Sequence, residues 1–190
     1  MNLRIPFLNK IIGEIADESV ILFECDTGIG FHVFLEIAKK HDDLTIFAHK
    51  RLKRVFGKKV IYPNDDYNLQ QLYTIPLAIK KCKFKIVMFT ILHDLFSIHS
   101  TDSVCNLFTE VANIVRDCKK IMLSSIDTKL ISERALSMLE NESDYVIEIR
   151  EFMDGLKIKR GIRVKKSLTK PPSDFYSLDL EKLEIGDKLI

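Results

Sequence analysis

The residues with the clearest chemical pattern in this chain form a loop within residues 20–32. An apolar run over 19–25 predicts a buried strand, residues 30–40 predict a helix, and Gly28 and Gly30 mark the turn between them. A glycine-containing loop between a strand and a helix is the setting in which the pattern G-x-x-x-x-G-K-[ST] binds phosphate. Backbone N–H groups, a lysine and a magnesium-ligating hydroxyl do the binding. The spacing therefore directs attention to phosphoryl chemistry.

The side chains that this chemistry needs are missing from the loop. When the pattern is laid on the sequence, Cys25 takes the first glycine, Phe31 the lysine and His32 the hydroxyl residue, while Gly30 is kept. A phenyl ring supplies neither charge nor a hydrogen bond, and imidazole suits Mg²⁺ poorly because this ion prefers oxygen. The sequence predicts a degenerate phosphate loop with no catalytic residue and no cofactor. Its positions are Cys25, Asp26, Thr27, Gly28, Ile29, Gly30, Phe31 and His32.

The elements around the loop predict an α/β domain with a mainly parallel sheet, because apolar runs alternate with helical stretches. Further strands are expected over 44–48, 60–62, 84–90 and 121–125, and helices over 52–56, 68–81, 102–117 and 130–139. The run 84–90 is the most apolar and is expected inside the sheet. Residues 145–151 and 157–165 flank Asp154-Gly155 and predict a β-hairpin, and a short strand is expected near 175–180. Without a repeat or linker, residues 1–190 are expected to form one domain.

Composition excludes several classes of protein. Of the 190 residues, 46% are hydrophobic and 29% charged, with a net charge of +2, and no apolar run is long enough to span a bilayer. No secretory leader is evident, so a cytoplasmic location without membrane contact is expected. The four cysteines lack C-x-x-C spacing and the five histidines include no helical i, i+4 pair. No metal site is therefore expected.

Both ends of the chain resemble the KaiC-like branch of the RecA superfamily of ATPases. The lead-in Ile5-Pro6-Phe7-Leu8-Asn9-Lys10-Ile11-Ile12-Gly13 is similar to I-P-G-L-D-E-L-L-G, and Asp26-x-Gly28-x-Gly30 is similar to the P-G-x-G core. Residues 133–149 and 161–166 resemble the strands near the family's C-terminus. Residues 42–118 match only in the order of strands and helices. The resemblance implies a three-layer RecA-like sandwich with a C-terminal hairpin.

The resemblance also implies functional positions that this chain does not fill. A Walker B acid would be expected at the end of the strand 84–90, where Phe89 and Thr90 stand, and the catalytic Glu pair would fall at Ala48-His49. ATP hydrolysis is therefore not expected, and we expect a scaffold or regulator that acts through protein contacts. Lys165 and Lys166 occupy the strand that reaches the neighbouring subunit in KaiC-like rings. They are candidate subunit contacts in a homo-oligomer or with a protein partner.

Three alternatives remain open at this stage. Basic stretches over 50–59, 80–85 and 157–170 would suit an accessory single-stranded nucleic-acid-binding protein related to recombinase paralogues, although aromatic residues are not interleaved with them as a stacking platform requires. A rebuilt enzyme site could combine Cys25, His32 and Asp94, with His49 and His93 expected near the same sheet edge. The loop's backbone N–H groups could also bind an anion weakly.

Overall fold

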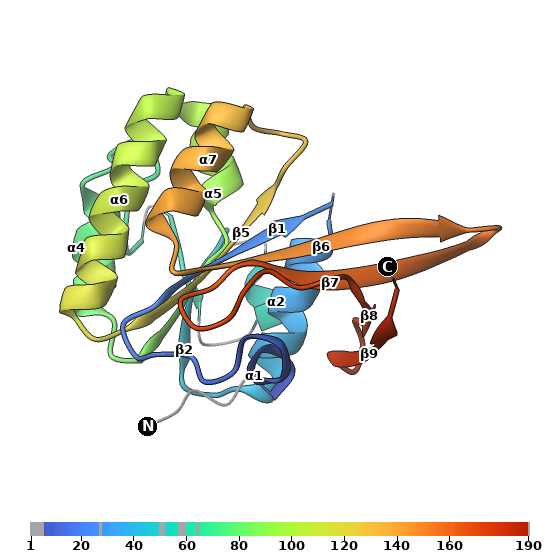
Figure 1. Ribbon diagram of the computed structural model, residues 1–190. Helices are drawn as coiled ribbons and strands as arrows, with labels where there is room; N and C mark the ends of the chain where they lie inside the picture. Colours follow the sequence, from blue (N-terminus) through green and yellow to red (C-terminus); the bar gives the residue numbers. More distant parts are fainter. Residues whose placement is uncertain (1–5, 27, 50–51, 57–59, 64, 190) are drawn as a thin grey trace.

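The computed structural model describes residues 6–26, 28–49, 52–56, 60–63 and 65–189 (Figure 1). Within these residues one sheet has the strand order β3-β2-β4-β5-β1-β6-β7-β8-β9. The strands are β1 (Val20–Cys25), β2 (Leu44–Phe47), β3 (Val60–Ile61), β4 (Ile86–Phe89), β5 (Ile121–Asp127), β6 (Tyr145–Asp154), β7 (Lys157–Lys166), β8 (Tyr176–Asp179) and β9 (Glu184–Lys188). The helices are α1 (Pro6–Ile12), α2 (Ile29–Lys40), α3 (Lys53–Phe56), α4 (Thr74–Lys81), α5 (Leu92–Ile98), α6 (Thr101–Asp117) and α7 (Glu133–Glu142).

The first six strands in this order (β3, β2, β4, β5, β1 and β6) are parallel to one another. Strands β7, β8 and β9 add antiparallel pairs at the end of the sheet that follows β6. Strand β1 lies between β5 and β6, and β4 lies beside β5. The carboxyl ends of β1, β4 and β5 therefore meet at one edge of the sheet, which is where open α/β sheets bind ligands. The loop after β1 lies at this edge.

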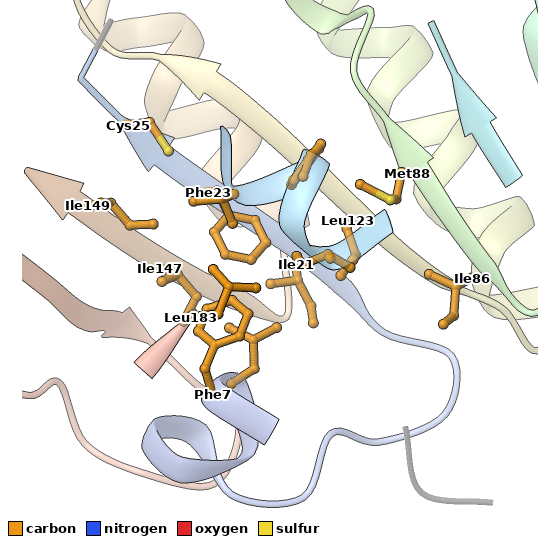
Figure 2. Packing of buried hydrophobic residues seen from close by; sticks show 14 of the residues in the cluster. Phe7, Ile21, Phe23, Cys25, Ile86, Met88, Leu123, Ile147, Ile149 and Leu183 are labelled. Atoms are coloured by element: carbon orange, nitrogen blue, oxygen red, sulfur yellow. The ribbon is translucent and has the colours of Figure 1, made fainter. Parts of the chain in front are cut away.

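Each face of the sheet has its own hydrophobic cluster. Helices α1, α2 and α3 cover one face, and α4 to α7 cover the other (Figure 1). Alternate residues of β1 belong to the clusters on the two faces of the sheet, because successive side chains in a strand point to opposite faces. Ile21 and Phe23 pack toward α1 and α2 together with Ile147 and Leu183 (Figure 2), while Leu22 packs toward α6. Every residue of β1 is buried, as expected for an interior parallel strand.

The predicted fold class is confirmed, and most predicted elements are present, with shifted ends. The helix predicted over 68–81 begins only at Thr74, whose hydroxyl accepts a hydrogen bond from the backbone N–H of Asn68 at 2.8 Å and so stabilises a turn. The helix predicted from residue 130 begins at Glu133, because Ser132 caps it through the N–H of Ala135. Elements α1, α5 and β9 were not predicted. Each is short, and β9 exists through its pairing with β8.

Some sequence-based predictions concern residues outside the described ranges. They are Ile5 of the lead-in, Thr27 of the loop and the basic residues Lys50, Arg51, Lys58 and Lys59. Among the residues that are described, none belongs to a helix long and apolar enough to cross a bilayer.

The predicted hairpin is present and extends well beyond the body of the molecule (Figure 1). Strand β1 pairs with β6 only as far as Ile149, and the β6–β7 ladder continues to the pair Asp154–Lys157. Gly155 in the turn has a φ of 60°, a conformation that glycine adopts without a steric penalty. We call residues 150–161 the arm. It projects from the same sheet edge that carries the loop after β1, because β1 and β6 are parallel.

Candidate functional site

The loop after β1 borders a cavity of about 300 Å³, which we call the loop cleft. The Ile29 N–H donates to the Asp26 carbonyl at 3.1 Å, closing the turn into α2. The ends of β4 and β5 form the opposite wall. Among the described residues, the lining consists of Cys25, Asp26, Gly28, Gly30, Phe31, Thr90, His93, Ser125, Ile126, Asp127 and Leu130. The structure thus assembles a cleft at the place where the sequence predicts a phosphate loop.

Glycine is required at the two positions of the loop for different structural reasons. Gly28 has a φ of 82°, in the left-handed region that other residues seldom adopt, and a Cβ there would meet no described atom within 4 Å. Gly30 packs against β5, and a Cβ on it would lie 2.9 Å from the Cβ of Ser125. Gly28 is therefore needed for the backbone conformation, and Gly30 for the close approach of α2 to β5.

At the lysine and hydroxyl positions, Phe31 and His32 make no polar contact in the cleft with a residue that the structure describes. The ring of Phe31 lines the cleft and packs edge-on against Phe56 of α3, with 5.7 Å between ring centroids. Its ring also lies 5.9 Å from that of His32, which is exposed. An aromatic cluster between α2 and α3 therefore occupies the position at which a phosphate loop carries its ammonium group.

The positions expected to hold catalytic acids are also occupied by other side chains. Thr90 follows β4 and donates its hydroxyl hydrogen to the carbonyl of Phe47 at 2.7 Å. Asp94 is paired with His49, with 2.9 Å between its Oδ2 and the histidine Nε2. The acid that lines the cleft on this side is Asp127 at the end of β5. One of its oxygens accepts from the Lys129 N–H, and the other is buried without a described partner.

The alternative site of Cys25, His32 and Asp94 is not assembled around the cleft. Of these three residues, only Cys25 lines it among the described residues. Burial raises the pKa of the Cys25 thiol, and the neighbouring carboxylate of Asp26 adds to the effect, so the thiol stays protonated. Within the described part of the chain, no three His, Cys, Asp or Glu side chains are grouped so that they could hold a metal ion.

A charge network joins the loop to the arm, and the sequence analysis did not predict it. Asp26 accepts a hydrogen bond from the Glu151 N–H at 2.9 Å and from Arg150 Nη1 at 3.3 Å, and Lys129 Nζ lies 3.5 Å away. Burial alone would raise the pKa of Asp26, but these donors and cations outweigh it and lower that pKa. Arg150 also donates to Glu148 at 2.7 Å. The loop carboxylate is thus neutralised by the chain itself.

A second network joins β1 to α7 and to the candidate subunit contacts. Glu24 is fully buried, and Lys165 Nζ lies 3.0 Å from its Oε2 and 2.6 Å from Glu140 Oε1. Lys166 donates to the carbonyls of Glu140 and Asn141 at 2.8 and 3.1 Å. Both lysines therefore make contacts within their own chain, and their predicted role between subunits stays a prediction. In the sequence, the feature that could have indicated this network is Glu24, an acid inside the otherwise apolar run 20–25.

This environment raises the pKa of the Glu24 carboxyl above its ordinary value. Desolvation raises the pKa of its carboxyl to about 7, and the neighbouring Glu140 adds to the effect, while Lys165 opposes it. Its neighbour in the sheet, Glu148, is affected in the opposite direction. Burial would raise the pKa of Glu148, but the hydrogen bonds from Arg150 and Arg163 prevail and lower it.

We compared the sequence and the structure of this chain with those of known proteins. No family model and no curated protein matches the sequence. A KaiC-like protein from the hyperthermophilic archaeon Pyrococcus horikoshii has a similar structure, with a TM-score of 0.71 and 15% identity, over 97% of this chain and 96% of that chain. The flagellar accessory protein FlaH from Methanocaldococcus jannaschii is similar with a TM-score of 0.70 and 16% identity, over 100% and 98% of the two chains. The chain therefore has the RecA/KaiC-like fold, as the motifs at its two ends predicted.

Proposed function

We propose that this chain is a RecA/KaiC-like domain that does not hydrolyse ATP and acts as a scaffold or regulator through protein contacts. The observation that carries the proposal is the position of Phe31. Its ring lines the loop cleft and packs on Phe56, where a working phosphate loop would present an ammonium group. One of the similar structures is described as an accessory protein, which is a role of the same kind.

The residues of the cleft do not fit a magnesium triphosphate. Asp26 and Asp127 are its only formally charged lining residues among those described, and both are acids. Phosphate sites in this kind of fold need a lysine and backbone donors for the phosphates and oxygen ligands for Mg²⁺. Here the cation is missing, and Thr90 at the end of β4 uses its hydroxyl on the Phe47 carbonyl. The carboxylate of Asp127, which forms no ion pair with a described residue, would oppose a polyphosphate, whereas that of Asp26 is already neutralised by Arg150 and Lys129.

A thermal-shift panel tests this proposal. The chain is heated with ATP, ADP or GTP at up to millimolar concentration, each with and without magnesium, and with magnesium alone as the control. A ligand that binds only the folded state must raise the unfolding midpoint. We expect no nucleotide-dependent rise. A saturable rise that requires magnesium, together with phosphate release from ATP, would refute the proposal.

Nucleic-acid binding is the second candidate, and the basic segment 145–170, which contains the arm, is the feature that favours it. Residues 145–170 contain eight Lys and Arg against three Asp and Glu. Arg163 lies over the ring of Phe175 at 4.7 Å, and Phe152 is 5.1 Å from the same ring. However, ion pairs already neutralise part of this charge, including Arg160–Glu151 at 3.0 Å.

Fluorescence anisotropy with a labelled single-stranded oligonucleotide separates the two candidates. A nucleic-acid-binding protein would retain the oligonucleotide at 50 mM salt and release it steeply toward 200 mM, because phosphate contacts displace counterions. The scaffold proposal predicts no anisotropy change at either salt concentration.

A further inference from the structure

The end of the arm carries an exposed apolar group. Met153, Leu156 and Ile158 have exposed fractions of 71%, 101% and 55%. Met153 and Ile158 are directly opposite each other on β6 and β7, so they share one face, and Leu156 lies in the turn beyond them. We call residues 153–159 the arm tip. The hairpin carries the arm tip away from the body of the molecule (Figure 1), so these apolar side chains face the surroundings of the chain.

The apolar residues of the arm tip do not belong to the packing of the core. On the face of the sheet that α1 and α2 cover, Ile149 and Ile162 form the last buried pair between β6 and β7. The next pair on the same face, Glu151 and Arg160, is an ion pair of 3.0 Å with both side chains partly exposed. The apolar pair of the arm tip follows beyond these charges, because alternate residues of a strand share one face. Burial in the core therefore does not explain apolar side chains at this position.

Basic residues lie beside the apolar group. Lys157 follows Leu156 directly and forms no ion pair with any described residue. Lys159 is 2.5 Å from Asp154, but both side chains are exposed, and salt and water weaken such a pair. In the arm as a whole, four Lys or Arg residues stand against two Asp or Glu residues. The surface that receives the arm tip should therefore combine an apolar region with negative charge.

The small size of the apolar group favours a lipid bilayer over a protein or a nucleic acid. A stable protein interface buries about 800 Å² on each partner and uses some 20–30 residues a side, whereas the arm tip offers three apolar side chains. A single nucleic-acid strand binds by stacking its bases on aromatic rings, and these side chains are aliphatic. A bilayer needs no complementary shape, because it takes up the apolar side chains that a projecting element brings to it. Anionic lipid headgroups attract Lys and Arg beside such a contact.

We propose that the arm tip inserts into the surface of an anionic lipid bilayer. Leu156 enters the acyl-chain region first, and Met153 and Ile158 follow it. Lys157 and Lys159 stay at the level of the headgroup phosphates. Two to three residues at about 3.3 Å each give a depth of about 7–10 Å, which suits an interfacial anchor. No membrane contact was expected from the sequence, because it has no spanning segment and no evident leader, but a surface anchor requires neither.

Vesicle flotation without nucleotide tests the proposal. The chain is mixed with vesicles of phosphatidylcholine alone or with 30% phosphatidylserine, at 50 and 500 mM salt. We expect it to float with the anionic vesicles at low salt, and far less with neutral vesicles or at high salt. Leu156→Asp should lower the partition coefficient at least tenfold, and Lys157→Gln should lower it about fivefold on the anionic vesicles.

Leu168→Asp is the matched control for these variants. Leu168 has an exposed fraction of 62% and follows the end of β7 that is remote from the arm tip. The ten residues of β7 separate it from the tip by about 30 Å. This variant should leave the partition coefficient unchanged. All three substituted side chains, at positions 156, 157 and 168, are exposed, so circular dichroism should show unaltered folding.

Tryptophan fluorescence locates the inserted residue. The chain has no tryptophan, so Leu156→Trp and Leu168→Trp each introduce a single probe. On addition of anionic vesicles, the emission of the Leu156→Trp variant should shift to shorter wavelength and be quenched by brominated acyl chains. The emission of the Leu168→Trp variant should not change.

Four results would overturn the proposal. They are no flotation with anionic vesicles at 50 mM salt, flotation that Leu156→Asp leaves intact, equal quenching at the two probe positions, and binding of a single-stranded oligonucleotide in place of vesicles. The last result would assign the basic arm to nucleic acid. Because no nucleotide is present, each of these results leaves the prediction for magnesium nucleotide standing. A rise of the unfolding midpoint with magnesium nucleotide would in turn leave the flotation result unaffected.

Discussion

Replacing Glu24 by glutamine should change how the stability of this protein depends on pH. The carboxyl of Glu24 has a pKa of about 7 in the folded chain and an ordinary value of 4.5. Between these values the folded protein keeps a proton that the unfolded chain releases. Unfolding therefore releases a proton, and the free energy of unfolding falls as the pH rises from about 4.5 through 7.

The size of the effect follows from the difference between the two pKa values. The difference corresponds to a loss of about 3 kcal/mol in the free energy of unfolding between low and high pH. The Glu24→Gln variant has no carboxyl group at this position and should not show this loss. The amide has the same shape, and Lys165 can donate to its oxygen while Glu140 accepts from its nitrogen. At pH 5 the two proteins should differ little. At pH 8.5 the variant should be more stable by about 1–3 kcal/mol, which for a chain of this size is a rise of about 2–10 °C in Tm.

Urea unfolding at half-unit steps from pH 5 to 8.5 measures the effect. Other titrating groups are common to both proteins, so the difference between their free energies of unfolding isolates Glu24. Glu140→Gln serves as a comparison, because it removes the other acid bonded to Lys165 and should bring the pKa of Glu24 down. The reasoning is refuted if the variant is the less stable protein at pH 8.5, since Glu24 would then be an ionised partner that stabilises the fold.

Two further predictions concern the loop. Gly30→Ala should destabilise the protein by about 1–3 kcal/mol, because the new Cβ overlaps Ser125. Adding Ser125→Gly to the same chain should recover most of this loss, as measured by urea unfolding. Gly28→Ala should not be rescued by Ser125→Gly, because its cost comes from the left-handed backbone conformation. Asp26→Asn should cost about 1–2 kcal/mol at pH 7, because it removes one of the two carboxylates that Arg150 contacts and leaves only Glu148. Since the pKa of Asp26 is lowered in the folded state, the wild-type advantage should be present above its ordinary pKa and disappear as the pH falls through the folded value, and an advantage that persists in strong acid would contradict this.

The loop and its surroundings show which features can be predicted from local sequence. The strand over 19–25, the two glycines and the helix after them were predicted because apolar runs and glycine report on backbone conformation directly. The hairpin at Asp154-Gly155 was predicted for the same reason. The helix α5 and the strand β9 were not, because short segments have little periodicity of their own and depend on the surfaces against which they pack.

The sequence by itself determined the order of strands and helices, the RecA/KaiC-like fold class and the replacement of the loop's lysine and hydroxyl residue by Phe31 and His32. Only the tertiary structure decided which charges meet. Glu24 and Lys165 are 141 positions apart, and Asp26 and Arg150 are 124 apart. Their contacts depend on the order of β1, β6 and β7 and on a register shift after Val146 that leaves Lys165 as the extra residue on β7. Strand order and register arise from packing over the whole sheet, so no local pattern encodes them.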